Sequence, residues 1–175
     1  PEITSGYIFN YATFSNAKLT IGSNVKSIPA NFLANAPDEA FSELIIEDGE
    51  PLTIGNAAFM GSTNITALDD SYGRITSIGN QAFRNTGLTG TLVLGSGIES
   101  IGHASFKGTS IEKLIIQGSE TRVSISGAGA NTNGAFSELA TLTTVIGNNV
   151  KAVGWGAFYN SSNLVAVDLS KSGDL

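Results

Sequence analysis

Residues 78–83, Ile-Gly-Asn-Gln-Ala-Phe, contain the phrase that decides the fold. The phrase consists of a branched aliphatic residue, usually a glycine, a short spacer with small residues, and then a phenylalanine. It returns at residues 54–59, 101–106 and 153–158, in a shortened copy at 28–32, and around a glycine-rich insertion at 125–136. Such internal self-similarity indicates an array of repeats, each of which is one small structural unit.

The period of the repeat limits the architecture. The phenylalanines of the six copies are 27, 24, 23, 30 and 22 residues apart, at Phe32, Phe59, Phe83, Phe106, Phe136 and Phe158. A unit of about two dozen residues cannot bury its own apolar face, so neighbouring units must bury one another in continuous columns. The sequence therefore predicts a solenoid.

Each copy also contains two short extended segments. The phenylalanine is followed by a stretch of branched aliphatic residues such as Leu92-Val93-Leu94 or Leu114-Ile115-Ile116, which predicts a short strand. A shorter apolar pair, such as Ile98 and Ile101, predicts a second strand. We expect about six stacked repeats of 22–30 residues, with short parallel strands and with short helical or 3₁₀ turns that carry the phenylalanines.

The combined motif is Ile-Gly-x-x-Ala-Phe, then Leu-x-x-Leu-x-Leu, then Val-x-x-Ile-Gly. Over residues 19–169 it resembles the BspA-like branch of bacterial leucine-rich repeats. The resemblance implies a leucine-rich-repeat solenoid of the α/β repeat class that is rich in β-structure. It also implies a secreted or surface-displayed bacterial protein, often one involved in adhesion or host contact. The family often has a proline after the strand and a cysteine after the phenylalanine; this chain has no cysteine and is a divergent member.

We expect one domain over residues 1–175. Residues 1–18 carry an aromatic and aliphatic cluster, from Tyr7 to Phe14, that predicts a partial repeat capping the first core layer. Residues 19–175 hold the repeats, of which the last is incomplete. We therefore expect the parent protein to continue beyond this segment, and an open strand edge to allow end-to-end self-association.

Composition argues against several kinds of partner and chemistry. The net charge is -6 and the nine lysine and arginine residues are scattered, so a nucleic-acid partner is not expected. No apolar run approaches the length of a membrane span, so direct membrane insertion of this segment is not expected. The absence of cysteine excludes disulfides, thiolate metal sites and cysteine nucleophiles.

No group of side chains predicts catalysis, a cofactor or a metal ion. His103 is the only histidine, and other copies fill its repeat position with asparagine or tryptophan, which favours a solvent-facing turn residue. Asp69 and Asp70 are neighbours on a strand and should point to opposite faces, so they are a poor pair for acid–base work. Residues 127–129, Gly-Ala-Gly, lack the third glycine and the lysine of a phosphate-binding loop and are interpreted as part of an insertion.

Two further kinds of feature have two interpretations each. Asn64 and Asn160 begin glycosylation sequons, although asparagine in turns is the favoured interpretation. Trp155 and Tyr159 form either an aromatic platform for a sugar or a cover for the end repeat, and the cover is favoured.

One set of residues predicts a binding surface. Alternation in the longer strand buries the flanking aliphatic residues and turns the residue between them outward. These outward residues form a row across the repeats: Ile45, Asp69, Val93, Ile115, Ile146 and Asp168. Glu43, Glu47, Thr91, Lys113, Gln117 and Thr144 form a polar rim beside it. High β-propensity explains exposed branched residues in part, but a contiguous apolar row more often marks a contact surface.

The sequence therefore favours a non-enzymatic protein-interaction module of an extracellular or cell-surface bacterial protein. Its partner would be a protein, such as a host extracellular or cell-surface protein. Two alternatives remain: a carbohydrate-binding or carbohydrate-processing β-helix, and a passive structural stalk that spaces other domains.

Overall fold

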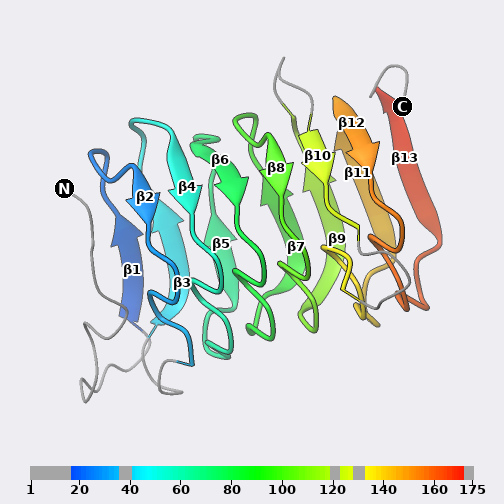
Figure 1. Cartoon of the computed structure of the whole chain (residues 1–175), viewed down its shortest axis with the longest axis horizontal. Coiled ribbons are helices and arrows are strands. Elements are labelled where there is room, and N and C mark those ends of the chain that lie inside the picture. Colours follow the sequence, from blue (N-terminus) through cyan, green and yellow to red (C-terminus); the bar gives the residue numbers. More distant parts are fainter. Residues whose placement is uncertain (1–16, 36–40, 119–122, 128–132, 172–175) are drawn as a thin grey trace.

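The computed structural model describes residues 17–35, 41–118, 123–127 and 133–171. Over these residues the chain winds through successive turns of a solenoid, which stack side by side along its long axis (Figure 1). Every strand pairing is parallel, and each strand pairs with strands of the neighbouring turns rather than with the next strand in the chain. The predicted repeat solenoid is confirmed.

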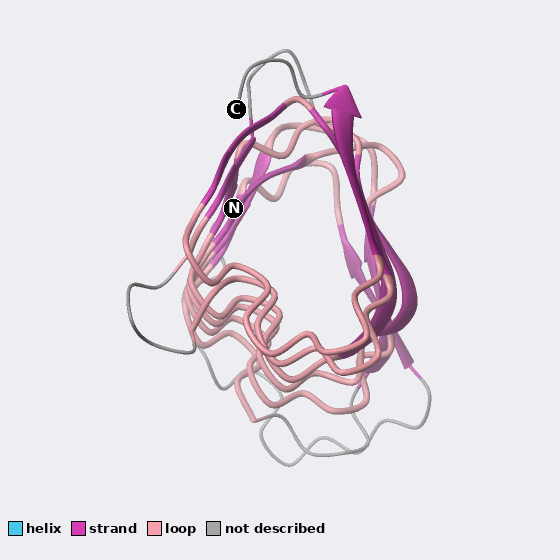
Figure 2. Cartoon of the chain, turned by 90° about the vertical axis from the view of Figure 1, so that its right-hand side faces the viewer, coloured by secondary structure: helices cyan, strands magenta, loops and turns pink. Residues whose placement is uncertain are grey.

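One side of the solenoid, which we call the long-strand wall, is built from the odd-numbered strands (Figures 1 and 2). They are β1 (Ala17–Ile21), β3 (Phe41–Ile46), β5 (Ala67–Asp69), β7 (Thr89–Leu94), β9 (Ser110–Ile116), β11 (Thr144–Asn148) and β13 (Ala166–Lys171). They form two sheets, β1-β3-β5 and β7-β9-β11-β13, because no strand ladder joins β5 to β7. The Thr89 amide donates a hydrogen bond to the Thr66 carbonyl across this boundary at 3.3 Å, so the two sheets continue in one wall.

The opposite side, the short-strand wall, is a single six-stranded sheet in the order β12-β10-β8-β6-β4-β2. Its strands are β2 (Ser27–Ile28), β4 (Leu52–Ile54), β6 (Ile75–Ile78), β8 (Ser100–Ile101), β10 (Val123–Ile125) and β12 (Val150–Val153). The two walls converge at one edge of the cross-section, and turns close the third side (Figure 2).

The turns on the third side carry the phenylalanines and are not helical. Within a turn, some backbone amides donate to the carbonyl three residues earlier, as the Ala82 amide does to the Gly79 carbonyl. Alternate amides donate to a carbonyl of the next repeat, as the Phe83 amide does to the Ser105 carbonyl at 2.7 Å. A left-handed residue, such as Gln81 with φ 59°, stands two positions before the phenylalanine in the turns of Phe59, Phe83, Phe106 and Phe158. Positive φ breaks a right-handed helix, so the expected short helical segments are replaced by chains of turns that are hydrogen-bonded from repeat to repeat.

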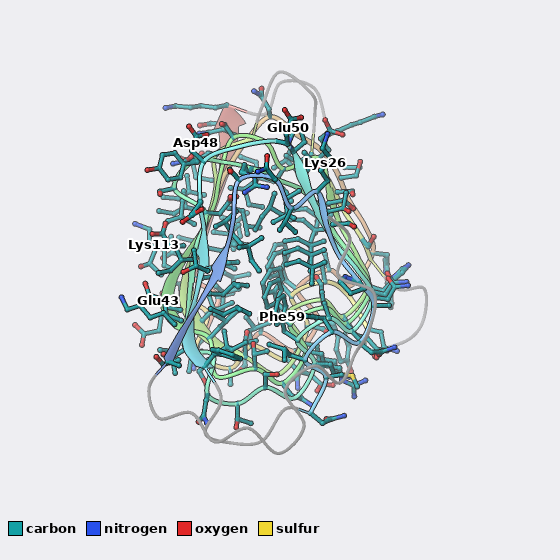
Figure 3. All side chains as sticks on the ribbon, turned by 90° about the vertical axis from the view of Figure 1, so that its left-hand side faces the viewer. Lys26, Glu43, Asp48, Glu50, Phe59 and Lys113 are labelled. Atoms are coloured by element: carbon teal, nitrogen blue, oxygen red, sulfur yellow. The ribbon has the colours of Figure 1, made fainter. Side chains whose placement is uncertain are left out.

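The phenylalanine side chains stack in a ladder inside the solenoid. From Phe59 to Phe136 the neighbouring rings are nearly parallel, with centroids 5.1–5.2 Å apart. This spacing is close to the ~4.8 Å between neighbouring strands, so the ladder follows from one phenylalanine per turn. The stack lies behind the labelled Phe59 in the interior (Figure 3). Five of the six phenylalanines are fully buried, whereas Phe158 in the last repeat is only partly buried.

The last described repeat has an open face. β13 is an edge strand, and Val165, Val167 and Trp155 are 85%, 53% and 64% exposed. By contrast, Ile21, Ile28 and Phe32 in the first described repeat are buried. The expected cluster from Tyr7 to Phe14 lies outside the described residues. End-to-end association through the open face stays a prediction.

Candidate functional site

The row of outward residues on the long-strand wall has the geometry that alternation predicts. On β9 the side chains of Leu114 and Ile116 are fully buried, and Ile115 between them is partly exposed. The same pattern holds at Ile45 and Val93, and the carboxylates of Asp69 and Asp168 are exposed. All six predicted residues therefore point away from the core.

Strand register aligns these residues within each of the two sheets of the wall, and the two sheets meet between Asp69 and Val93. Ile45 pairs with Asp69, Val93 with Ile115, Ile115 with Ile146, and Ile146 with Asp168. Thr20 on β1 pairs with Ile45 and extends the row by one position. Sequence reasoning missed Thr20 because no full phenylalanine phrase precedes it. The alternation Leu19-Thr20-Ile21 could have indicated this position.

The central part of the row is a stripe of three aliphatic side chains, Val93, Ile115 and Ile146, on the neighbouring strands β7, β9 and β11. We call these three residues the apolar stripe. Their branched side chains lie side by side at strand spacing, so together they present a continuous apolar surface. Asp69 and Asp168 stand one strand beyond the stripe at either end.

A hollow of about 440 Å³ opens on the wall at the boundary between β5 and β7. It is lined by Glu43, Leu68, Asp69, Asp70, Ser71, Thr91, Val93 and Gln117. Two of these, Asp69 and Val93, are row residues, so the row crosses the hollow. The boundary arises where β5 ends at Asp69, while β7 continues to Leu94.

The next residue, Asp70, turns inward and holds a turn in place. Its carboxylate accepts the backbone N–H of Arg74 at 2.9 Å and of Ile75 at 3.3 Å. Burial raises the pKa of the Asp70 carboxyl above its ordinary 3.8, while these N–H donors and the Arg74 charge oppose that rise. The sequence correctly placed Asp69 and Asp70 on opposite faces, but it did not predict a buried carboxyl group.

Arg74 is also buried, and its guanidinium joins the carbonyls of earlier repeats. It donates to the carbonyl oxygens of Glu50 at 2.5 Å, Glu47 at 2.8 Å and Gly22 at 3.2 Å, and also to that of Val25. All of these acceptors are backbone atoms of the turns where the two walls converge. A raised carboxyl pKa can mark a catalytic group, but here both side chains are committed to backbone groups, which indicates a structural role.

Charged side chains flank the row on the same outer face. Glu43 on β3 forms an ion pair with Lys18 at 2.6 Å, and Thr91 on β7 pairs in register with Lys113 on β9. Glu43 and Lys113 both point outward from the long-strand wall, while Phe59 lies inside (Figure 3). Three of the residues predicted for the polar rim, Glu43, Thr91 and Lys113, therefore lie beside the row.

His103 and the adjacent carboxyl groups of Asp69 and Asp70 lie on different parts of the solenoid. His103 is exposed on a turn, and its backbone N–H donates to the Asn80 side-chain oxygen at 2.9 Å. Among the described residues, no three acidic, histidine or cysteine side chains gather to hold a metal ion. No helix in the described ranges is long and apolar enough to cross a membrane.

The other candidate features lie apart from the row. Gly127 is described, but residues 128–132 of the insertion lie outside the described residues. Ile65 is buried between the first sequon's asparagine and threonine, as expected. Trp155 and Tyr159 are 64% and 46% exposed on the last repeat, and neither the sugar platform nor the cover is tested by this exposure.

The solenoid has two walls of parallel strands and one phenylalanine-bearing turn per repeat, and its period lies in the range of leucine-rich repeats. The chain belongs to the family of the BspA type leucine-rich repeat region, whose model matches residues 2–127 and 131–174 in six copies. No curated protein and no solved structure matches the chain significantly. Repeat modules of this class generally serve protein interaction through the extended surfaces that stacking creates.

Proposed function

We propose that the chain is a non-enzymatic module of a secreted or surface-displayed bacterial protein, and that it binds a partner protein in adhesion or host contact. The binding surface is the row on the long-strand wall: Thr20, Ile45, Asp69, Val93, Ile115, Ile146 and Asp168. The observation that carries the proposal is the apolar stripe, in which three aliphatic side chains are aligned in register and partly exposed to solvent.

The short-strand wall provides an internal control for this argument. Its outward residues are also aligned in register, and they are Ser27, Thr53, Ser77, Ser100, Ser124 and Ala152. The Ser100 hydroxyl donates to the Ser77 hydroxyl at 2.9 Å, so small polar side chains suit an outward position in this solenoid. A strand in this solenoid therefore does not require an aliphatic residue at that position, and the stripe is better explained by contact with a partner.

Site-specific crosslinking tests the proposed surface. A photoreactive amino acid would replace Ile115 on the long-strand wall or, as the control, Thr53 on the outer face of the short-strand wall. We expect a protein crosslink from Ile115 with extracellular-matrix or host-surface extracts, and its loss when Ile146→Glu is added to the same chain. Equal crosslinking from both positions, or no effect of Ile146→Glu, would show that the row is not the binding surface.

A further inference from the structure

The row has a simple order of chemical groups from β5 to β13. An acidic residue, Asp69, is followed by the three residues of the apolar stripe and then by a second acidic residue, Asp168. Asp69 and Val93 lie together on the lining of the hollow. With the β5–β7 boundary counted as one strand step, four steps of about 4.8 Å separate the positions of the two carboxylates by about 19 Å.

The two carboxylates are held outward in the same way. The Ser71 amide donates to Asp69 Oδ1 at 3.0 Å, and the Ser170 amide donates to Asp168 Oδ1 at 2.9 Å. Hydrogen bonds from the Ser170 hydroxyl and amide lower the pKa of the Asp168 carboxyl, which keeps it ionised at neutral pH. Neither aspartate belongs to an ion pair among the described residues. Both charges can therefore interact with a partner.

The cations of this face are placed differently. Lys113 lies on β9 two residues before Ile115, so its positive charge stands beside the centre of the stripe. Lys18 is paired with Glu43, and Lys171 attracts Asp168 from the end of the same strand. Electrostatic complementarity therefore favours basic groups of a partner at Asp69 and Asp168, on either side of the apolar stripe, and disfavours them beside the centre of the stripe.

Beside Asp69 the surface has depth as well as charge, because the hollow opens there. Leu68 and Val93 supply apolar lining, and Thr91 and Gln117 supply side-chain oxygens that can accept hydrogen bonds. A lysine or arginine side chain combines an aliphatic stem with a charged head that donates hydrogen bonds. Its stem would pack on the apolar lining while its head reaches Asp69.

We infer that the row receives an extended polypeptide segment that is apolar in its middle and carries a basic residue at each end. The inference rests on the proposed function and specifies the chemistry of the partner. An extended chain advances about 3.3 Å per residue, so basic residues six positions apart span about 20 Å and match the two aspartates. One basic side chain occupies the hollow at Asp69, and the other reaches Asp168.

A pair of peptides with the same composition tests this arrangement. The first is a capped heptapeptide with lysine at its first and seventh positions, valine at its third and fifth, and threonine between them. The second exchanges the lysines and valines, so that the charges lie at the centre. Binding is measured by titration into ¹⁵N-labelled protein, following the amide resonances of Val93, Ile115 and Ile146.

We expect the first peptide to shift these resonances with a dissociation constant at least severalfold below that of the second. Asp69→Asn and Asp168→Asn should each weaken binding of the first peptide by about twofold to fivefold, the range of exposed charge pairs. The control Glu99→Gln removes a negative charge next to β8 on the other wall and should leave binding unchanged.

Three results would overturn the inference: equal binding of the two peptides, no effect of either aspartate substitution, or shifts caused by a neutral xylo-oligosaccharide but not by the first peptide. Each is distinguishable from failure of the proposed function. If crosslinking from Ile115 stays specific while these results are found, a protein still binds the row, but not through basic ends. If crosslinking shows no preference for the row, the proposed function itself is wrong.

Discussion

On the short-strand wall, the outward residues of six neighbouring strands are serine and threonine, with one alanine at the end. On the long-strand wall, the corresponding line begins with Thr20, contains four aliphatic residues and includes two aspartates. The inward residues of both walls are alike, because Ile101 and Leu114 are both fully buried aliphatic residues in the same core. Core packing and strand geometry therefore account for what the walls share, and the proposed function attributes the difference between their outer faces to contact with a partner.

The largest expected effect tests the similarity of the interiors. Leu114→Ala on the long-strand wall and Ile101→Ala on the short-strand wall should each lower the free energy of unfolding by about 2–5 kcal/mol, through lost burial and a residual cavity. Urea denaturation followed by circular dichroism measures both. If one variant were nearly as stable as the wild type, the two walls would not share one core, and their exteriors could not be compared on equal terms.

The next effect concerns the edge where the walls converge. Arg74→Met keeps an apolar stem but removes the donors to four backbone carbonyls, so we expect a loss of about 1–3 kcal/mol in the free energy of unfolding. Lys26→Met is the matched control, since Lys26 is exposed and its ion pair with Glu50 spans 3.6 Å; it should cost less than about 0.5 kcal/mol. Equal losses in the two variants would contradict the joining role of Arg74.

Acidification probes the same edge through Asp70. Its carboxyl pKa is raised in the folded protein, mainly by burial, so the native state takes up a proton at a higher pH than the unfolded chain does. This contribution to stability is fully present below the unfolded pKa, near 3.8, and is lost as pH rises through the folded pKa. Relative to Asp70→Asn, the wild type should therefore gain stability as pH falls through this window. Parallel pH dependences in thermal unfolding of the two proteins would show that the carboxyl is not perturbed.

Sequence reasoning succeeded wherever the repeat itself carried the information. Alternation around Val93 and Ile115 placed their side chains outward, and the phenylalanine phrase placed Phe83 in the core; the structure confirms each of these. It did not predict the left-handed Gln81, because glutamine does not favour positive φ and the reason is tertiary: the Gln81 amide bonds to the His103 carbonyl of the next repeat. The hollow was missed for a similar reason. It lies where no strand ladder joins β5 to β7, and this gap can be seen only when both strands are placed in three dimensions.

The smallest expected change in stability gives the sharpest test of the difference between the walls. Ile115→Thr and Ile146→Thr keep a branched side chain suited to a strand, so each should lower the free energy of unfolding by no more than about 1 kcal/mol. The reverse exchange on the other wall, Thr53→Ile, should change it by less than about 0.5 kcal/mol.

If the stripe exists for a partner, the two threonine variants lose the partner crosslink and Thr53→Ile does not gain one. If the stripe instead holds the sheet together, the threonine variants unfold at clearly lower urea concentration, by 2 kcal/mol or more on the scale of buried side chains. Urea denaturation separates these two explanations without knowledge of the partner, because only the second requires the aliphatic side chains for folding.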